Sequence, residues 1–122
     1  MIKQILYQNL PKIKADFIGF SPNDTYFGLY KEDELVSIAG FKIIGRKRVR
    51  LCSNYTFPQH RHKGYMRELL KAMLTDIIPY DIPLDARCLE TSWRIYISLG
   101  FKLLEIKKYK TFDIYIMKKG EK

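Results

Sequence analysis

The sequence predicts an α+β fold, in which helices pack on a mixed, mostly antiparallel central sheet of about six strands. Three observations predict it. Residues 25–57 alternate between aromatic or β-branched segments and short polar turns, as in an antiparallel meander. Residues 65–78 place apolar side chains at the spacing of an amphipathic helix. Residues 84–89 form a short apolar segment after that helix, so we expect a strand parallel to the one before the helix.

The first half of the chain is predicted to form a helix and three strands. Residues 2–19 show a helix-like apolar spacing, interrupted by Pro11 and ending near Gly19. Ser21 to Asp24 form a turn cluster. Strands are expected at residues 25–30, 35–44 and 49–57, joined by turns at 31–34 and 45–48.

The second half is predicted to close the fold with a short helix and a hairpin. Pro79 ends the helix of residues 65–78. Thr91 is expected to cap a second helix, with Gly100 just beyond its end. Residues 101–109 and 112–117 are predicted to pair as a hairpin, and the polar tail at 118–122 is expected to fray.

Composition indicates a single domain over residues 1–122. Hydrophobic residues make up 47% of the chain, enough for a core at this length. No signal peptide or bilayer-spanning segment is recognised, so we expect a cytoplasmic protein without membrane contact. Cys52 and Cys88 lie in apolar segments and are interpreted as reduced core thiols.

The start of the helix at residues 65–78 is unusual. No Ser, Thr, Asp or Asn precedes it, and no acidic residue is expected in its first turn. A helix N-terminus carries about half a positive charge, so cations there are unfavourable unless an anion binds. A strand, a basic turn with a glycine and a helix therefore predict a phosphate-binding cradle. The clustered basic residues are His60, Arg61, His62, Lys63 and Arg67.

The spacing argues against two other kinds of site. His60 and His62 form a His-x-His pair that Cys52 or Cys88 would have to complete. That arrangement matches no strong zinc motif, and the flanking cations oppose a metal, so no metal site is predicted. Cys52 lies within a predicted strand with no acid nearby in the sequence to orient a histidine base. This argues against a cysteine nucleophile.

Two segments resemble signatures of the GCN5-related N-acetyltransferase family. Residues 61–66, RHKGYM, are similar to the family's cofactor-binding motif, Arg/Gln-x-x-Gly-x-Gly/Ala, which follows a strand and opens a helix. Residues 93–101, WRIYISLGF, resemble a second signature, a helix that carries a tyrosine and ends in Leu-Gly-Phe. A predicted strand separates the two, and the resemblance extends over residues 25–117.

The resemblance implies an acetyl-CoA-dependent N-acetyltransferase with an acyl-CoA N-acyltransferase-like fold. It implies a parallel strand pair that splays apart at the cofactor site, and helices on both faces of the sheet. A backbone N–H near Phe57 would polarise the acetyl carbonyl, and Tyr96 would protonate the departing CoA thiolate while an amine attacks directly. The implied cofactor-binding residues are Tyr55, Thr56, Phe57, Arg61, His62, Lys63, Gly64, Tyr65 and Met66.

The chain departs from the family pattern in several places. Met66 replaces the second Gly or Ala of the motif, and its place in the apolar stripe favours a side chain in the core. Residues 88–91 lack the Asn that many members carry, and the N-terminal helical region is short. Residues 49–57 contain no carboxylate, so the general base is either absent or acts through water. The candidates for such a base are Glu32, Glu34 and Glu105.

The net charge of +9 favours an anionic partner, although surface lysines also keep a small domain soluble. The acceptor could be a small-molecule or a peptide amine, and acidic or phosphorylated acceptors fit the charge best. Exposed edge strands would permit a homodimer. A basic run with Tyr55 and Tyr109 elsewhere supports an alternative, a nucleic-acid-binding or nucleic-acid-associated module with an acetyltransferase-like fold and little or no catalysis. The run consists of Lys42, Arg46, Lys47, Arg48 and Arg50.

Overall fold

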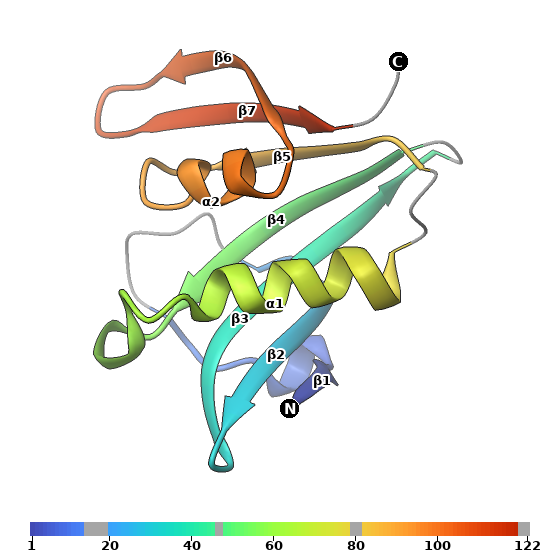
Figure 1. Ribbon diagram of the computed structural model, residues 1–122, viewed down its shortest axis with the longest axis vertical. Coiled ribbons are helices and arrows are strands. Elements are labelled where there is room, and N and C mark those ends of the chain that lie inside the picture. Colours follow the sequence, from blue (N-terminus) through green and yellow to red (C-terminus); the bar gives the residue numbers. More distant parts are fainter. Residues whose placement is uncertain (14–19, 46–47, 79–81, 120–122) are drawn as a thin grey trace.

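A seven-stranded mixed sheet forms the body of the protein, with the strand order β1-β2-β3-β4-β5-β7-β6 (Figure 1). The computed structural model describes residues 1–13, 20–45, 48–78 and 82–119. The strands are β1 (Ile2–Ile5), β2 (Thr25–Lys31), β3 (Glu34–Ile44), β4 (Arg48–Thr56), β5 (Leu84–Cys88), β6 (Lys102–Lys108) and β7 (Asp113–Lys119). The helices are α1 (Tyr65–Ala72), which the π-helical turn η3 (Met73–Ile77) extends, and α2 (Trp93–Ser98). Two 3-10 turns complete the set, η1 (Tyr7–Asn9) and η2 (Pro58–His60).

The mixed α+β architecture predicted from the sequence is confirmed, with one strand more than expected. The additional strand is β1, which pairs antiparallel with β2 through Ile2↔Leu29 and Ile5↔Tyr26. The helix predicted from residue 2 is therefore wrong at its start, and residues 14–19 lie outside the described part. Ile2 and Ile5 have a helical spacing, but pairing the outer edge of β2 satisfies backbone groups that a helix would leave exposed.

The start of α2 and the end of β7 differ from the prediction, whereas the residue that follows α2 is as predicted. Ser92, not Thr91, is the residue before α2, and it makes no side-chain capping bond. Gly100 follows α2 in the left-handed conformation, with φ of 97°, as predicted. Lys118 and Lys119 belong to β7 and not to a frayed tail, and the Lys119 amino group donates to the Leu99 carbonyl at 2.8 Å.

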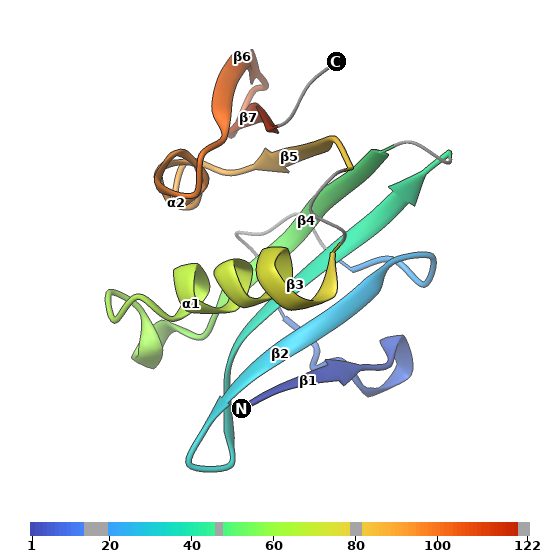
Figure 2. The ribbon, with the colours of Figure 1, turned by 45° about the vertical axis from the view of Figure 1, so that its right-hand side comes forward.

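Two hydrophobic clusters pack on the sheet. The larger cluster contains Leu69 and Leu70 of α1 together with Tyr96 of α2, so both α-helices share one face (Figures 1 and 2). The smaller cluster contains Tyr26 and Ile38, and the N-terminal segment packs against it. Helices were expected on both faces of the sheet. On the face that the N-terminal segment covers, the helical element among the described residues is the 3-10 turn η1. No helix in the described ranges has the length and apolar character needed to cross a membrane.

The parallel pair of strands, β4 and β5, is joined for only part of its length. Three pairs are formed, Val49↔Leu84, Arg50↔Asp85 and Leu51↔Ala86, after which the two strands separate. The β3–β4 register shifts at the same level, between Ile38 and Gly40 of β3. Ser53 adopts a positive φ of 56° there, so β4 carries a β-bulge where it leaves β5. The predicted splaying of the parallel pair is thus confirmed.

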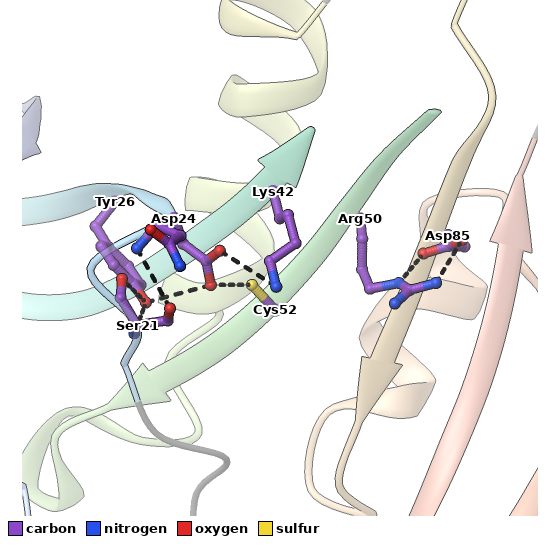
Figure 3. A network of polar contacts seen from close by, with 8 residues as sticks. Ser21, Asp24, Tyr26, Lys42, Arg50, Cys52 and Asp85 are labelled. Carbon is purple, nitrogen blue, oxygen red and sulfur yellow. Dashed lines mark hydrogen bonds and ion pairs between the residues drawn. The ribbon is translucent and has the colours of Figure 1, made fainter. Parts of the chain in front are cut away.

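A charged cluster fastens the paired end of these two strands. Asp85 of β5 is almost buried, and its carboxylate accepts hydrogen bonds from Arg50 Nε at 2.7 Å and Arg50 Nη2 at 3.4 Å (Figure 3). Arg48 Nη1 donates to the same carboxylate at 3.3 Å. Because the two arginines lie on β4 and the carboxylate on β5, the cluster holds together the short ladder from which the strands diverge.

Replacing Asp85 with Ala should lower the free energy of unfolding by about 1–3 kcal/mol, because two arginines lose a partly buried partner. Urea denaturation measures the change. Asp113→Ala is the matched control, since Asp113 pairs with an exposed Lys108 across the hairpin and should cost about 0.5 kcal/mol or less. Equal effects of the two substitutions would contradict a stabilising role for the Asp85 cluster.

Candidate functional site

The separation of β4 from β5 creates an open pocket. Its lining consists of Asn54 from β4 and of Arg87, Cys88, Leu89 and Ser92 from β5 and the segment that follows it. The volume is about 220 Å³, which includes the mouth that is open to solvent. The pocket lies at the carboxyl end of the parallel pair, the usual end for ligand binding in sheets of this kind.

The end of β4 offers free backbone groups to this gap. The Phe57 N–H donates to the Val36 carbonyl at 3.1 Å, so the N–H predicted to act near Phe57 cannot be that of Phe57 itself. Successive residues of a strand direct their N–H groups to opposite edges, so Thr56 directs its N–H and C=O away from β3. Arg61 Nε accordingly reaches the Thr56 carbonyl at 2.8 Å. Thr56 is therefore the residue that presents an N–H to the gap.

The segment after β4 forms the predicted cradle. His62 and Gly64 adopt positive φ values of 66° and 80°, and Gly64 precedes α1 without any side-chain cap. Within the described ranges, the N–H groups of residues 62–67 donate no hydrogen bond, and the first helical bond runs from the Glu68 N–H to the Gly64 carbonyl. A side chain at Gly64 would point into open space. These unpartnered N–H groups at a helix N-terminus form a site suited to a phosphate or pyrophosphate.

Basic side chains surround the cradle, as predicted. Arg61, His62, Lys63 and Arg67 are all exposed, and Arg67 Nε donates to Ser98 Oγ of α2 at 3.0 Å. The Arg61 guanidinium lies over the Tyr55 ring, with its carbon 5.3 Å from the ring centroid. The basic turn therefore contacts the end of β4, and Arg67 of α1 contacts the end of α2.

At the start of α1, Glu68 differs from what was expected and Met66 agrees with it. Glu68 lies in the first turn of α1, where no acid was expected, and pairs with Lys31 at 2.9 Å. The Lys31 amino group also lies over the ring of half-buried Tyr65, 5.3 Å from its centroid. Met66 is only 6% exposed and belongs to the larger cluster. Its side chain points away from the cradle, which confirms the expectation that Met66 is a core residue.

Tyr96 of α2 lies behind Asn54, which lines the pocket. It is fully buried, and its hydroxyl accepts a hydrogen bond from the Asn54 side-chain amide. Burial raises the pKa of Tyr96, so the phenol stays protonated across the physiological range. The other polar atom of Asn54, Oδ1, is buried and has no hydrogen-bond partner in the described part of the chain. Asn54 was not predicted as a site residue, because the β-bulge that turns its side chain toward Tyr96 has no recognisable sequence signal.

A second group that sequence reasoning missed lies beside Cys52. The Cys52 thiol lies 3.4 Å from Asp24 Oδ2, although the two residues are 28 positions apart in the sequence (Figure 3). An acid therefore does lie near this thiol, contrary to expectation. Burial nevertheless raises the pKa of the Cys52 thiol to about 12, which opposes a nucleophilic role at neutral pH. No group of three metal-ligating side chains occurs among the residues that the structure describes.

The three glutamates proposed as a base do not approach the gap. Glu34 accepts a hydrogen bond from His60 at 3.0 Å, and this bond lowers the pKa of Glu34. Glu32 lies in the exposed turn between β2 and β3, and Glu105 is exposed on β6. None of them lines the pocket between β4 and β5.

Both cysteines should react slowly with iodoacetamide in the native protein at pH 8. Burial raises the pKa of each thiol to about 12, so little thiolate is present. Mass spectrometry should show fast labelling only after denaturation in urea. The unfolded thiols ionise near pH 9 and the folded ones near 12, so these residues should make stability fall as pH rises through that interval. Rapid native labelling of either residue would contradict its burial as a neutral thiol.

Comparisons with known proteins agree with this architecture. The ribosomal-protein-S18-alanine N-acetyltransferase from Escherichia coli superposes with a TM-score of 0.67 at 19% identity, covering 81% of this chain and 70% of that one. A GNAT family acetyltransferase from Elizabethkingia anophelis, solved with acetyl-CoA bound, gives a TM-score of 0.68 at 10% identity, with coverages of 81% and 77%. No curated protein sequence gave a significant match. The sequence itself matches the Acetyltransferase (GNAT) family over residues 4–101, so the chain belongs to this family.

Proposed function

We propose that this protein is an N-acetyltransferase that uses acetyl-CoA as its donor and an amine as its acceptor. One observation carries the proposal: among the described residues, a cradle of unpartnered N–H groups directly follows a strand whose ladder with β5 ends at Leu51. The Elizabethkingia anophelis neighbour with acetyl-CoA bound shares this fold, which supports the choice of donor. Bound acetyl-CoA would supply an activated acetyl thioester.

The described residues fit a donor of this shape. The backbone of residues 62–67 would bind the pyrophosphate, assisted by the exposed cations Arg61 and Lys63. The end of β4, from Tyr55 to Phe57, would accompany the pantetheine arm, because its outer edge lacks a partner strand beyond Leu51. Met66 leaves room for this arrangement, since its side chain is in the core.

Two groups in the gap would assist the chemistry. The Thr56 N–H would donate to the carbonyl oxygen on which negative charge develops. Tyr96 holds a proton at Oη, and it would give this proton to the departing sulfur. Asn54 contacts the Tyr96 hydroxyl and lines the pocket, so it would orient that proton toward the gap.

The acceptor would be a peptide or small-molecule amine. The Escherichia coli neighbour is named for an alanine of ribosomal protein S18, but at 19% identity the likeness concerns the fold alone. The positive net charge favours acidic or phosphorylated acceptors. A cytoplasmic location and a homodimer stay predictions of the sequence.

The nucleic-acid alternative gains little from the structure. Arg48 and Arg50 bind Asp85, and Lys42 lies 3.8 Å from Asp24. The rest of the basic run, Arg46 and Lys47, falls outside the described residues. The charges that would have to bind phosphates are thus already partly balanced within the protein.

Acetyl-CoA should raise the free energy of unfolding by about 2–3 kcal/mol at a hundredfold excess over its Kd. Gly64→Ala should remove most of this increase, because a side chain is strained at a φ of 80° and the backbone of the cradle has to shift to relieve the strain. Gly45→Ala is a matched control: Gly45 also has a positive φ and open space where a Cβ would lie, but it is in the β3–β4 turn. Thermal unfolding with and without ligand measures both. If acetyl-CoA stabilised the Gly64 variant as much as the wild type, this would argue against the cradle as its binding site. If acetyl-CoA did not stabilise the wild type, and the protein bound RNA or DNA in a salt-sensitive way, the nucleic-acid-binding alternative would be favoured.

Tyr96→Phe should retain the stabilisation by acetyl-CoA but lower turnover on the order of 10²-fold, since the proton donor is lost. Release of free CoA, followed with a thiol reagent across a panel of amines, measures the turnover. Tyr115→Phe is the control, because Tyr115 is also largely buried and its hydroxyl bonds no described residue. Full activity in the Tyr96 variant would remove this residue from the proposed chemistry.

A further inference from the structure

A network of polar side chains lies on the sheet face opposite α1 and α2, with Asp24 at its centre (Figure 3). Asp24 ends the turn that precedes β2, and its side chain is only 6% exposed. Carboxylates are rarely buried to this degree unless both oxygens are bonded or have a function. Asp85 is buried to a similar degree, but both of its oxygens accept hydrogen bonds from arginines.

The two oxygens of Asp24 have different surroundings. Oδ2 accepts hydrogen bonds from the Tyr26 hydroxyl at 3.5 Å and from the Cys52 thiol at 3.4 Å. Oδ1 is buried and accepts no hydrogen bond from any described residue. Lys42 Nζ lies 3.8 Å from Oδ1, close enough for attraction but beyond hydrogen-bond distance. A buried acceptor of this kind has the capacity to receive a donor from a ligand.

The neighbours of Asp24 place it beside the gap. Cys52 is the first residue of β4 beyond the last pair with β5, Leu51↔Ala86. The contact between the Cys52 thiol and Asp24 Oδ2 therefore places this carboxylate against β4 at the level where the strand leaves β5.

We propose that the Asp24 carboxylate takes up the proton that the acceptor amine loses, and that the acceptor enters from the face opposite α1 and α2. This inference rests on the proposed function. Asp24 takes one proton from the acceptor ammonium, which frees the nitrogen lone pair. The nitrogen then forms a bond to the thioester carbon, the carbon–sulfur bond breaks, the sulfur receives the proton of Tyr96, and the second proton lost by the nitrogen passes to solvent. The titratable groups that face Asp24 are Tyr26 of β2, Lys42 of β3 and Cys52 of β4.

This assignment supplies what β4 lacks. No carboxylate occurs between Arg48 and Thr56, and the glutamates considered from the sequence lie away from the pocket. The amine must lose a proton for the transfer to proceed, since the ammonium form has no lone pair to attack with. Among the described residues, Asp24 is the carboxylate that contacts β4 beyond its last pair with β5, Leu51↔Ala86.

Two probes of different basicity test the proposal on the full chain. Butylamine is protonated at neutral pH and needs a base, whereas hydroxylamine is already a free base. Asp24→Asn should lower acetyl transfer to butylamine on the order of 10²-fold, while transfer to hydroxylamine should change by about twofold or less. The loss with butylamine should shrink as pH rises toward the pKa of that amine. Asp76→Asn, at an exposed site on η3, is the control and should change neither rate.

The stabilisation by acetyl-CoA should be unchanged in the Asp24→Asn protein, which separates donor binding from proton transfer. Equal losses with both probes, or no loss with butylamine, would overturn the role of Asp24. If the Asn variant does not fold, Asp24→Glu makes the same comparison, because it keeps the carboxylate but displaces it. A wild-type protein that binds acetyl-CoA but acetylates neither probe would overturn the transferase activity, and this inference with it.

Discussion

The interruption of the β4–β5 ladder is the constraint on which the rest of the site depends. Parallel neighbours need a crossover, and here the crossover is α1, so the helix must start beside the end of β4. The same chain segment therefore supplies both the free strand edge and the N–H groups of the cradle. α2 follows β5 in the same way and brings Tyr96 to the other side of the gap. Had the two strands stayed paired to their ends, none of these groups would face a common space.

Two local features determine where the strands part. The Arg48 and Arg50 contacts with Asp85 hold the paired end, and the bulge at Ser53 bends β4 at the first residues beyond it. The bulge also shifts side-chain alternation, so Cys52 faces the outer side of the sheet toward Asp24, whereas Asn54 reaches Tyr96. Because of the bulge at Ser53, Cys52 and Asn54 therefore lie on opposite faces of the sheet.

The sequence predicted the elements that have a strong local pattern. The meander, α1, the left-handed Gly100 and the cradle follow from periodicity, turn residues and charge. The predicted N-terminal helix was wrong at its start, because Ile2 and Ile5 fit a helix and a strand equally well and only pairing with β2 decides between them. Asn54 and Asp24 could not be selected, since their roles come from a positive φ at Ser53 and from a contact across 28 residues. Neither leaves a local signal.

The cradle is made mainly of backbone groups, and this has a consequence for how such a site tolerates change. Amide N–H groups are the same whichever side chains accompany them, so only positions that set the backbone path, such as Gly64 with its φ of 80°, are restricted in residue type. His62, with its φ of 66°, is restricted in the same way, whereas the exposed Lys63 carries no such restriction. A site of this kind can persist while most of the sequence is replaced, which agrees with structural neighbours that share the fold at 10–19% identity.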